Sequence, residues 1–507
     1  MRGRHLPLIA AVVAVVIAVV MGAAGCSTPS SSSASSTPDR SDAPTESTVD
    51  GTSIDWTTFS GDKTVQTATI DVPIDHADPA KGTFRLALAR HLADPKQRIG
   101  SLLVNPGGPG FGGTDFAKFA DQIYSSNLLS RFDIVAWDPR GTGDSTPAID
   151  CIDDYDRYYT GMDITPDTPE ERQLPIDLAK EFTDHCLEQN KGIWPYIGTN
   201  ASARDMDDIR QALGEATISY FGFSYGSELG ATWATLFPST VRAAVLDGAV
   251  DPNAGYIDSG LQQAAGFEQA ITSFLAGCSA TSSCPFHNDG DAEGAFDRLM
   301  LDIDDTPIPT VDGRPELTRS MALTAVAEAM YSESLWEQAH QALADAQQGD
   351  GAGLLALFDE YFRRRSDGTW DNSLEAFQVI SCADEPARLT VEEEDAAAVK
   401  FQEVAPRYSP GTIGSYFCTF FPPSPDPEVP VNAKGAGPIL VMGTTGDPAT
   451  PLASTRLMAD ALDDGRLVIV HAEGHTGYAI GECSGDVVDR YLIDPAKDAP
   501  ADGAECK

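Results

Sequence analysis

The sequence predicts an α/β fold, in which a mostly parallel central sheet has helices on both faces and a large, mainly helical lid inserted before its last strands. Two patterns and one local motif predict it. Short apolar runs at 100–105, 132–137, 218–223 and 241–246 are separated by helical or Gly-rich segments, as in a buried parallel sheet. Helical periodicity then dominates residues 251–432, and strand-like runs return at 438–442 and 466–470.

The local motif is the turn at 222–226, whose sequence is Gly-Phe-Ser-Tyr-Gly. A β-prone run ends at this turn, and a small-residue helical pattern begins at Ser227. The two glycines omit side chains that would collide with the helix and the neighbouring strand. This is the context of a nucleophile elbow, which projects a serine hydroxyl above the sheet at the positive end of a helix. We therefore predict that Ser224 is a nucleophile.

The other elements follow in chain order. Residues 84–91 alternate like a half-exposed strand, and the strand at 100–105 runs into a Gly- and Pro-rich loop at 106–113. Residues 201–213 are predicted to be a helix, with Asn200 or Ser202 as its N-cap. An insertion between late strands of such a sheet lies over the strand C-termini, so we predict a lid that shapes the pocket; a packing or oligomerisation domain is the alternative. Within it, helical periodicity is clearest at 266–275, 321–331, 335–347 and 354–365.

Composition limits the function classes. The chain has 507 residues, 42% of them hydrophobic and 22% charged, which is typical of a globular protein with a large core. Its formal net charge of −42 argues against a nucleic-acid partner, because phosphate binding needs a basic face. The acidic surface could attract a cationic substrate terminus or serve only solubility.

The N-terminus predicts export. Two arginines precede an apolar run at 6–21, and Ala-Ala-Gly-Cys follows at 23–26, which resembles a bacterial lipobox. We expect Cys26 to carry a lipid anchor at the outer face of the cell membrane. Ala23 departs from the usual leucine, so ordinary secretion or an uncleaved membrane anchor stays open. The predicted domains are a signal peptide at 1–26, a Ser/Thr/Pro-rich tether at 27–52, the α/β core at 53–250, the helical lid at 251–434 and the rest of the core at 435–507.

Cysteine usage also predicts export. Eight cysteines remain besides Cys26, and an even number in an exported chain indicates disulfides. Eight cysteines allow 105 connectivities, among which proximity in sequence favours four pairs. None lies in a Cys-x-x-Cys pair, and we expect neither a metal nor a cofactor. The favoured pairs are Cys151 with Cys186, Cys278 with Cys284, Cys382 with Cys418, and Cys483 with Cys506.

A nucleophilic serine needs a base and an acid, which follow it in this architecture in the order Ser, Asp or Glu, His. His475 lies in a Gly-flanked loop after the last predicted strand and is the preferred base, with His471 at the strand end as the alternative. Asp447 is the only carboxylate in the loop after the strand at 438–442, so we predict that it orients the histidine. Asp247, after an earlier strand, is the reserve acid.

The oxyanion hole needs two backbone N–H donors. One is predicted to be the N–H of Tyr225, directly after the nucleophile. The second is predicted to come from the Gly-rich loop after the strand ending at Asn105, from Gly108 or alternatively Gly107. A phosphate-binding interpretation of this loop is disfavoured, because it lacks both the Lys-Ser/Thr of a Walker loop and regular G-x-G-x-x-G spacing.

Five motifs stand together in order: Asn-Pro-Gly-Gly-Pro-Gly at 105–110, Asp-Pro-Arg-Gly-Thr-Gly-Asp-Ser at 138–145, the serine turn at 222–226, Thr-Gly-Asp-Pro-Ala-Thr-Pro at 445–451, and Gly-His-Thr at 474–476. Together they resemble the secreted tripeptidyl aminopeptidases of Streptomyces and the related mycobacterial cell-envelope serine hydrolases. These belong to the prolyl-aminopeptidase-like branch of the α/β-hydrolase fold. The resemblance covers the chain after about residue 53.

The resemblance implies exopeptidase chemistry from a free N-terminus through an acyl-enzyme on Ser224. Such an enzyme needs an anion for the substrate's α-ammonium, and Asp384 or Glu385 in the lid is the candidate; surface carboxylates at a helix end are the alternative. A carboxylesterase or lipase acting on envelope esters would use the same triad. A non-catalytic binding protein with this fold is the third hypothesis, although Ser, Asp and His are all present in the expected order.

Overall fold

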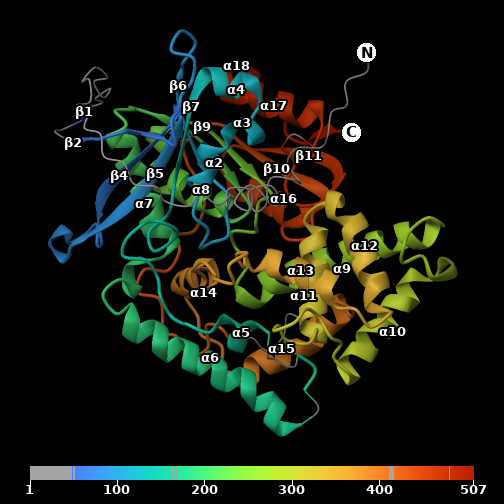
Figure 1. The fold of residues 1–507 in the computed structure, drawn as a ribbon. Helices are drawn as coiled ribbons and strands as arrows, with labels where there is room; N and C mark the ends of the chain where they lie inside the picture. Colours follow the sequence, from blue (N-terminus) through green and yellow to red (C-terminus); the bar gives the residue numbers. More distant parts are fainter. Residues whose placement is uncertain (1–47, 50–51, 161–163, 167, 410–415, 479) are drawn as a thin grey trace, which may run out of the picture.

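The computed structural model describes residues 48–49, 52–160, 164–166, 168–409, 416–478 and 480–507 (Figure 1). Its centre is a ten-stranded sheet, and a two-stranded pair lies apart from it. In spatial order the sheet consists of β12 (Ala504–Cys506), β11 (Gly465–Glu473), β10 (Ile439–Gly446), β9 (Val241–Asp247), β8 (Ile218–Phe223), β6 (Gly100–Asn105), β7 (Phe132–Trp137), β5 (Thr83–His91), β4 (Asp62–Pro73) and β3 (Thr57–Phe59). The separate pair is β1 (Thr48–Val49) with β2 (Thr52–Ser53).

The strands from β12 to β7 are parallel, whereas β5, β4 and β3 are added antiparallel at one edge. The chain passes from β6 to β7 on one side and then crosses to β8 on the other, so the strand order reverses between β6 and β8. Asn105, the last residue of β6, is in register with Gly222 of β8. The loop after β6 therefore begins beside the serine turn, at the crevice where open α/β sheets bind ligands.

Helices cover both faces of the sheet because alternate strand residues point to opposite sides. Leu103 and Tyr220 pack with α7 (Thr199–Ala212), α8 (Tyr225–Leu236) and α16 (Leu452–Ala461). On the other face, Leu102 and Phe221 pack with the helical segments α2 (Asp115–Lys118), α3 (Ala120–Ile123), α4 (Ser126–Arg131) and α17 (Glu482–Ile493), and α18 (Pro495–Asp498) follows α17. The predicted fold is thus confirmed. The helix predicted at 201–213 begins earlier, and its N-cap is Gly198, not Asn200 or Ser202.

The described chain between β9 and β10 is mainly helical, as predicted. Seven helices, here called the lid helices, lie below the sheet in Figure 1. Most share a core of their own around Phe274 and Phe358, which is separate from the two cores of the sheet. The lid helices are α9 (Tyr256–Ala280), α10 (Ala292–Asp305), α11 (Arg319–Met330), α12 (Trp336–Ala346), α13 (Ala352–Tyr361), α14 (Ser373–Asp384) and α15 (Val391–Val404). The domain boundaries drawn from the sequence stay predictions.

A second helical excursion, which the sequence did not reveal, lies between β7 and β8. It contains α5 (Tyr155–Tyr159) and the long α6 (Pro169–Gln189). Arg172 of α6 forms an ion pair with Asp395 of α15, and Figure 1 shows the two helices side by side. Glu375 of α14 accepts the backbone N–H of Ile152 at 3.2 Å. The segment between β7 and β8 therefore packs against the lid helices α14 and α15.

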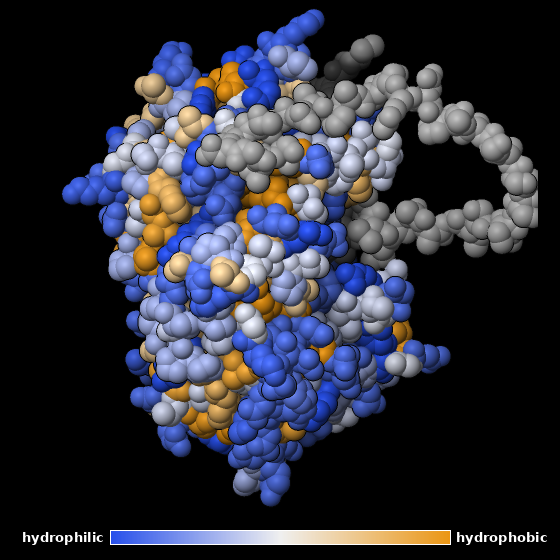
Figure 2. Space-filling model, turned by 90° about the vertical axis from the view of Figure 1, so that its left-hand side faces the viewer, coloured by the Kyte–Doolittle hydropathy of each residue, from blue (hydrophilic) through white to orange (hydrophobic). Residues whose placement is uncertain are grey.

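The four predicted disulfides are the pairs found in the structure. No helix among the described residues is long and apolar enough to cross a membrane. The predicted signal peptide, Cys26 and nearly all of the tether lie outside the described residues. Figure 2 shows one face of the molecule, on which hydrophilic residues predominate and hydrophobic residues lie in small separate groups. Short 3₁₀ helices connect larger elements at Pro79–Lys81, Trp194–Tyr196, Pro238–Thr240, Asn288–Gly290 and Glu333–Leu335.

Candidate active site

Ser224 occupies a strained turn between β8 and α8. Its φ of +56° is in a region that serine rarely adopts, and its N–H donates to the carbonyl of Asp247 at 2.8 Å. The turn is possible because Gly222 and Gly226 touch: a Cβ added at Gly222 would lie 2.2 Å from the carbonyl oxygen of Gly226. Packing around the two glycines thus holds the serine in a conformation that costs free energy.

His475 and Asp447 meet across the ends of β10 and β11. The imidazole Nδ1 lies 2.8 Å from Oδ1 and 3.0 Å from Oδ2 of Asp447. The carboxylate is fully buried, and it also accepts the backbone N–H groups of Ala449 at 3.0 Å, Thr450 at 2.8 Å and Thr476 at 3.1 Å. These donors fix the carboxylate orientation, so Nδ1 carries the proton and Nε2 is left as the acceptor nitrogen.

Asp247, the reserve acid, holds a different part of the same loop. It is fully buried, and its two oxygens accept the N–H groups of Gly477 at 2.7 Å and Tyr478 at 2.8 Å, just beyond His475. Burial raises the pKa of this carboxyl to about 7. The alternative base, His471, is exposed and lies 3.2 Å from Glu505 on β12. Asp247 thus fixes the backbone of the loop directly after His475.

Burial and charge act in opposite directions on His475. Burial alone would lower the pKa of the imidazole, but the charge and hydrogen bond of Asp447, with a contribution from Asp247, outweigh it, and the pKa is raised above its ordinary value. The buried Nε2 has no hydrogen-bond partner among the described residues. Among the described residues, no hydrogen bond joins Nε2 of His475 to the Ser224 hydroxyl, although both residues line the same pocket. Catalytic contacts of this kind commonly tighten only when substrate is bound.

The two candidate oxyanion donors both border the pocket that holds Ser224. Tyr225 opens α8, and Gly108 lines the pocket together with Ser224. The N–H of Gly107 is already engaged, because it donates to the side chain of the fully buried Asn105 at 2.9 Å. In the described part of the chain the N–H of Gly108 meets no acceptor, which makes it the available donor of the two.

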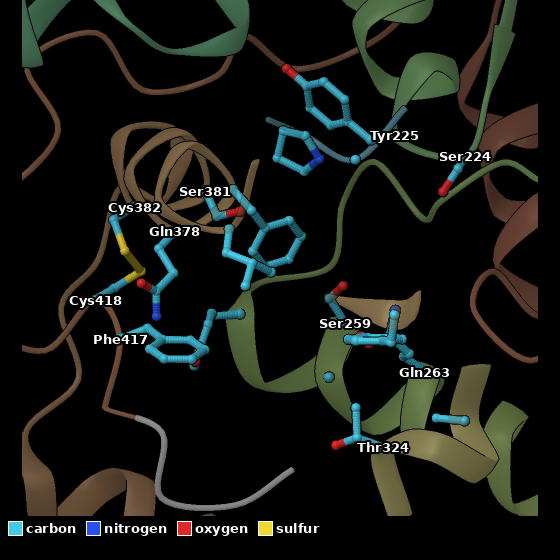
Figure 3. A pocket seen from close by; sticks show the side chains of 18 of the residues that line it. Ser224, Tyr225, Ser259, Gln263, Thr324, Gln378, Ser381, Cys382, Phe417 and Cys418 are labelled. Atoms are coloured by element: carbon cyan, nitrogen blue, oxygen red, sulfur yellow. A yellow bond between two sulfur atoms is a disulfide. The ribbon is translucent and has the colours of Figure 1, made fainter. Parts of the chain in front are cut away.

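A cavity of about 1140 Å³ opens above these residues, and the lid helices form much of its wall. Figure 3 shows Ser224 and Tyr225 on one side, with Ser259 and Gln263 of α9 and Thr324 of α11 facing them. Gln378 and Ser381 of α14 and Phe417 line the remaining side, beside the disulfide between Cys382 and Cys418. The space can hold several substrate residues, and the lid residues determine its shape.

Helix α14 is clamped onto the loop after β6. A Cβ added at Gly110 would lie 2.5 Å from both the N atom of Phe377 and the carbonyl oxygen of Ser373. Glycine is therefore required for the helix to approach so closely, and its φ of +92° would strain any other residue. This contact positions the pocket-facing side of α14 relative to Gly108.

Three half-buried carboxylates gather at one end of the cavity. Asp384, at the end of α14, accepts the N–H and the hydroxyl of Thr199, both at 2.7 Å. Burial, only partly offset by these bonds and reinforced by the charge of Glu228, raises the pKa of Asp384 to about 7. Burial also raises the pKa of Glu228 and, together with the charges of Glu228 and Asp384, that of Glu428. No described basic side chain forms an ion pair with any of the three, so the cluster favours a bound cation.

The two lid carboxylates predicted from the sequence have different surroundings. Glu385 also borders the cavity, but its oxygens accept the backbone N–H groups of Tyr256 and Ala387, both at 3.1 Å. Sequence reasoning missed Glu228 and Glu428. Glu228 is in the first turn of α8, four residues after Ser224, and could have been found from its position directly after the serine turn. Glu428 stands in a Pro-rich stretch with no periodic signal.

Sequence comparisons relate the chain to known proteins. Residues 100–481 match the α/β hydrolase fold family. Serine protease Hip1 of Mycobacterium tuberculosis is 36% identical over 457 residues, 86% of each chain, and carboxylesterase B of the same organism is 34% identical over 450 residues, 85% of each. Tripeptidyl aminopeptidase of Streptomyces lividans is 28% identical over 464 residues, 88% of this chain and 85% of that protein. These relatives confirm the resemblance seen in the motifs, and the chain belongs to the α/β hydrolase fold family.

Proposed function

We propose that the chain is a serine hydrolase in which Ser224 attacks a substrate carbonyl. Nε2 of His475 takes the hydroxyl proton and returns it to the leaving group, while Asp447 holds the imidazole and stabilises its charged form. The N–H groups of Tyr225 and Gly108 stabilise the developing oxyanion. Water then hydrolyses the acyl-enzyme. The strained turn, the bond between His475 and Asp447, and the pocket shared with Ser224 support these roles.

The substrate we propose is a peptide with a free N-terminus, from which a short peptide such as a tripeptide is released. One observation carries this proposal: the carboxylates of Asp384, Glu228 and Glu428 line the same cavity as Ser224, and no described basic side chain is paired with them. A substrate α-ammonium would supply the missing positive charge. An N-terminus bound there would also fix how many residues lie between it and the bond at Ser224, so that a peptide of defined length is released, as an exopeptidase needs.

The test compares a chromogenic tripeptide amide with its N-acetylated twin at about pH 8, where Asp384 is ionised. We expect hydrolysis of the free-amine form alone. Asp384→Asn should raise KM for that form by about 10-fold or more, because a charge-assisted contact is lost. The amide still offers Thr199 an acceptor, so the fold should persist.

Glu385→Gln is the matched control for that variant, since it alters the neighbouring carboxyl, whose oxygens serve backbone groups. Its KM should stay close to that of the unmodified enzyme. An unchanged KM in Asp384→Asn and in Glu228→Gln would remove the carboxylate cluster from the substrate site.

A carboxylesterase is the second candidate function. The same Ser224 machinery cleaves esters, and carboxylesterase B of Mycobacterium tuberculosis is 34% identical to this chain. Equal cleavage of the free and acetylated amides, or turnover of esters alone, would favour this candidate over the aminopeptidase.

We also propose that the mature protein is anchored by lipid on Cys26 at the outer face of the cell membrane. The segment at 1–26 and the four disulfides, which form in oxidising compartments, support export. In cells that express the full chain, we expect radiolabelled palmitate to be incorporated and the protein to partition into detergent. Cys26→Ala should abolish both, and labelling that persists in this variant would contradict the anchor.

A further inference from the structure

Another glutamate of the cavity stands apart from the carboxylate cluster. Glu328 lies on α11, lines the cavity and is only 5% exposed. Among the described residues its side-chain carboxylate has neither a hydrogen-bond partner nor an ion-pair partner, although its backbone carbonyl accepts the N–H of Tyr331. A carboxylate buried to this degree is normally paired, because leaving it alone costs free energy. The buried, unpaired carboxylate of Glu328 therefore indicates that a bound group supplies its partner.

The neighbouring charges do not neutralise Glu328. Burial, together with the charge of Glu360, raises the pKa of Glu328 to about 8, and Arg363 only partly opposes this. The guanidinium of Arg363 is engaged elsewhere, 3.4 Å from Asp371 and 5.0 Å from the ring centre of Phe111. Glu360 also lines the cavity, so this wall carries two carboxylates, and no described basic side chain forms an ion pair with either of them.

Glu328 is also close to the catalytic histidine along its own helix. Tyr331, one residue beyond the end of α11 and about one turn from Glu328, accepts the backbone N–H of His475 at 3.0 Å. Its ring meets the imidazole edge-on, with ring centres 5.4 Å apart. Thr324, one turn before Glu328, faces the cavity in Figure 3, across from Gln378. The wall that carries Glu328 therefore adjoins the reacting centre, whereas Asp384 belongs to the helix across the cavity.

We propose that Glu328 is a specificity-determining residue that binds the cationic side chain of a substrate lysine or arginine bordering the scissile bond. This rests on the proposed peptidase function. The cavity then has two anionic subsites with separate tasks: the cluster around Asp384 holds the N-terminal ammonium, and Glu328 selects a basic side chain. An ammonium or guanidinium group that enters the cavity would form an ion pair with Glu328, for which no described side chain provides a partner.

The experiment uses pentapeptides with free N-termini, Ala-Ala-Lys-Ala-Ala and Ala-Ala-Ala-Lys-Ala, each paired with a peptide in which uncharged norleucine replaces lysine. Mass spectrometry identifies the bond that is cut. We expect the unmodified enzyme to prefer lysine over norleucine by about 10- to 100-fold in kcat/KM at one of the two bordering positions. Glu328→Gln should reduce that ratio to about one while the norleucine peptide keeps its rate.

Glu337→Gln, which changes an exposed glutamate on α12, is the matched control and should keep the full preference. Equal cleavage of lysine and norleucine peptides by the unmodified enzyme overturns the proposal. So does a Glu328→Gln variant that loses both peptides equally, because that result marks a structural role. Norleucine peptides that are cut in a Ser224-dependent way leave the peptidase function intact in either case; if no peptide is cut, both proposals fail.

Discussion

Ser224→Ala is expected to lower kcat by roughly a millionfold, the largest effect of any single change in this chain. The substitution removes only the hydroxyl oxygen, which in the proposed mechanism forms the bond to the acyl group. The residual rate would come from the oxyanion donors and from substrate binding, which the variant keeps. Single-turnover kinetics on the free-amine tripeptide amide measure the loss. Calorimetry on the same variant should show that the peptide still binds.

Ser130→Ala is the control for this prediction. Ser130 lies on α4, where its hydroxyl donates to the carbonyl oxygen of Asn127 at 3.0 Å, and it does not line the cavity. Its kcat should match that of the unmodified enzyme. A fluorophosphonate probe should label Ser224 in the active protein and fail to label Ser224→Ala. Activity that survives this variant would place the nucleophile on another residue.

Asp447→Asn is expected to lower kcat by about 10⁴ with little change in KM. The amide can present an N–H to Nδ1, which favours the tautomer with its proton on Nε2, so that His475 no longer accepts the Ser224 proton. The imidazolium also loses the charge that stabilises it. Steady-state kinetics on the tripeptide amide give the kcat and KM values.

Asp247→Asn makes the matched comparison, because both carboxylates are buried beside the histidine loop. Asp247 contacts the backbone N–H groups of Gly477 and Tyr478, so its loss should lower the free energy of unfolding by about 1–3 kcal/mol. Its kcat should fall by no more than about 10-fold. Equal damage to kcat in the two variants would mean that Asp247 shares the orienting role.

The pH profile separates the two carboxylates further. The base must be neutral to act, so kcat/KM is lost as pH falls through the pKa of His475, which is raised above its ordinary value of 6.5. Without the charge of Asp447, burial dominates and that pKa falls. The acid limb of Asp447→Asn should therefore move to lower pH. A small activated ester such as p-nitrophenyl acetate is the suitable substrate, because it reacts with Ser224 without an N-terminal ammonium, so that Asp384, whose pKa is about 7, plays no part.

Local sequence patterns were sufficient to predict the central sheet and the serine turn. Parallel strands buried on both faces are continuous apolar runs, so β6, β7, β8 and β9 could be recognised without any partner strand. The turn at Ser224 was recognisable because its glycines, strand and helix are contiguous. Chain order then selected Asp447 and His475, which the structure joins at 2.8 Å. The four disulfides followed from proximity alone.

Local sequence patterns could not predict contacts between segments that are distant in the chain. Asp384 and Thr199 are 185 residues apart, yet they share two hydrogen bonds, and no periodicity in either segment reveals the other. The long α6 was missed because its mixed surface packs partly against the lid rather than the sheet. The sequence by itself determined the fold class, the candidate triad and the order of its parts. Only the tertiary structure decided which carboxylates meet in the cavity and which, like Glu328, are buried there unpaired, because burial and pairing depend on neighbours that the folded chain alone brings together.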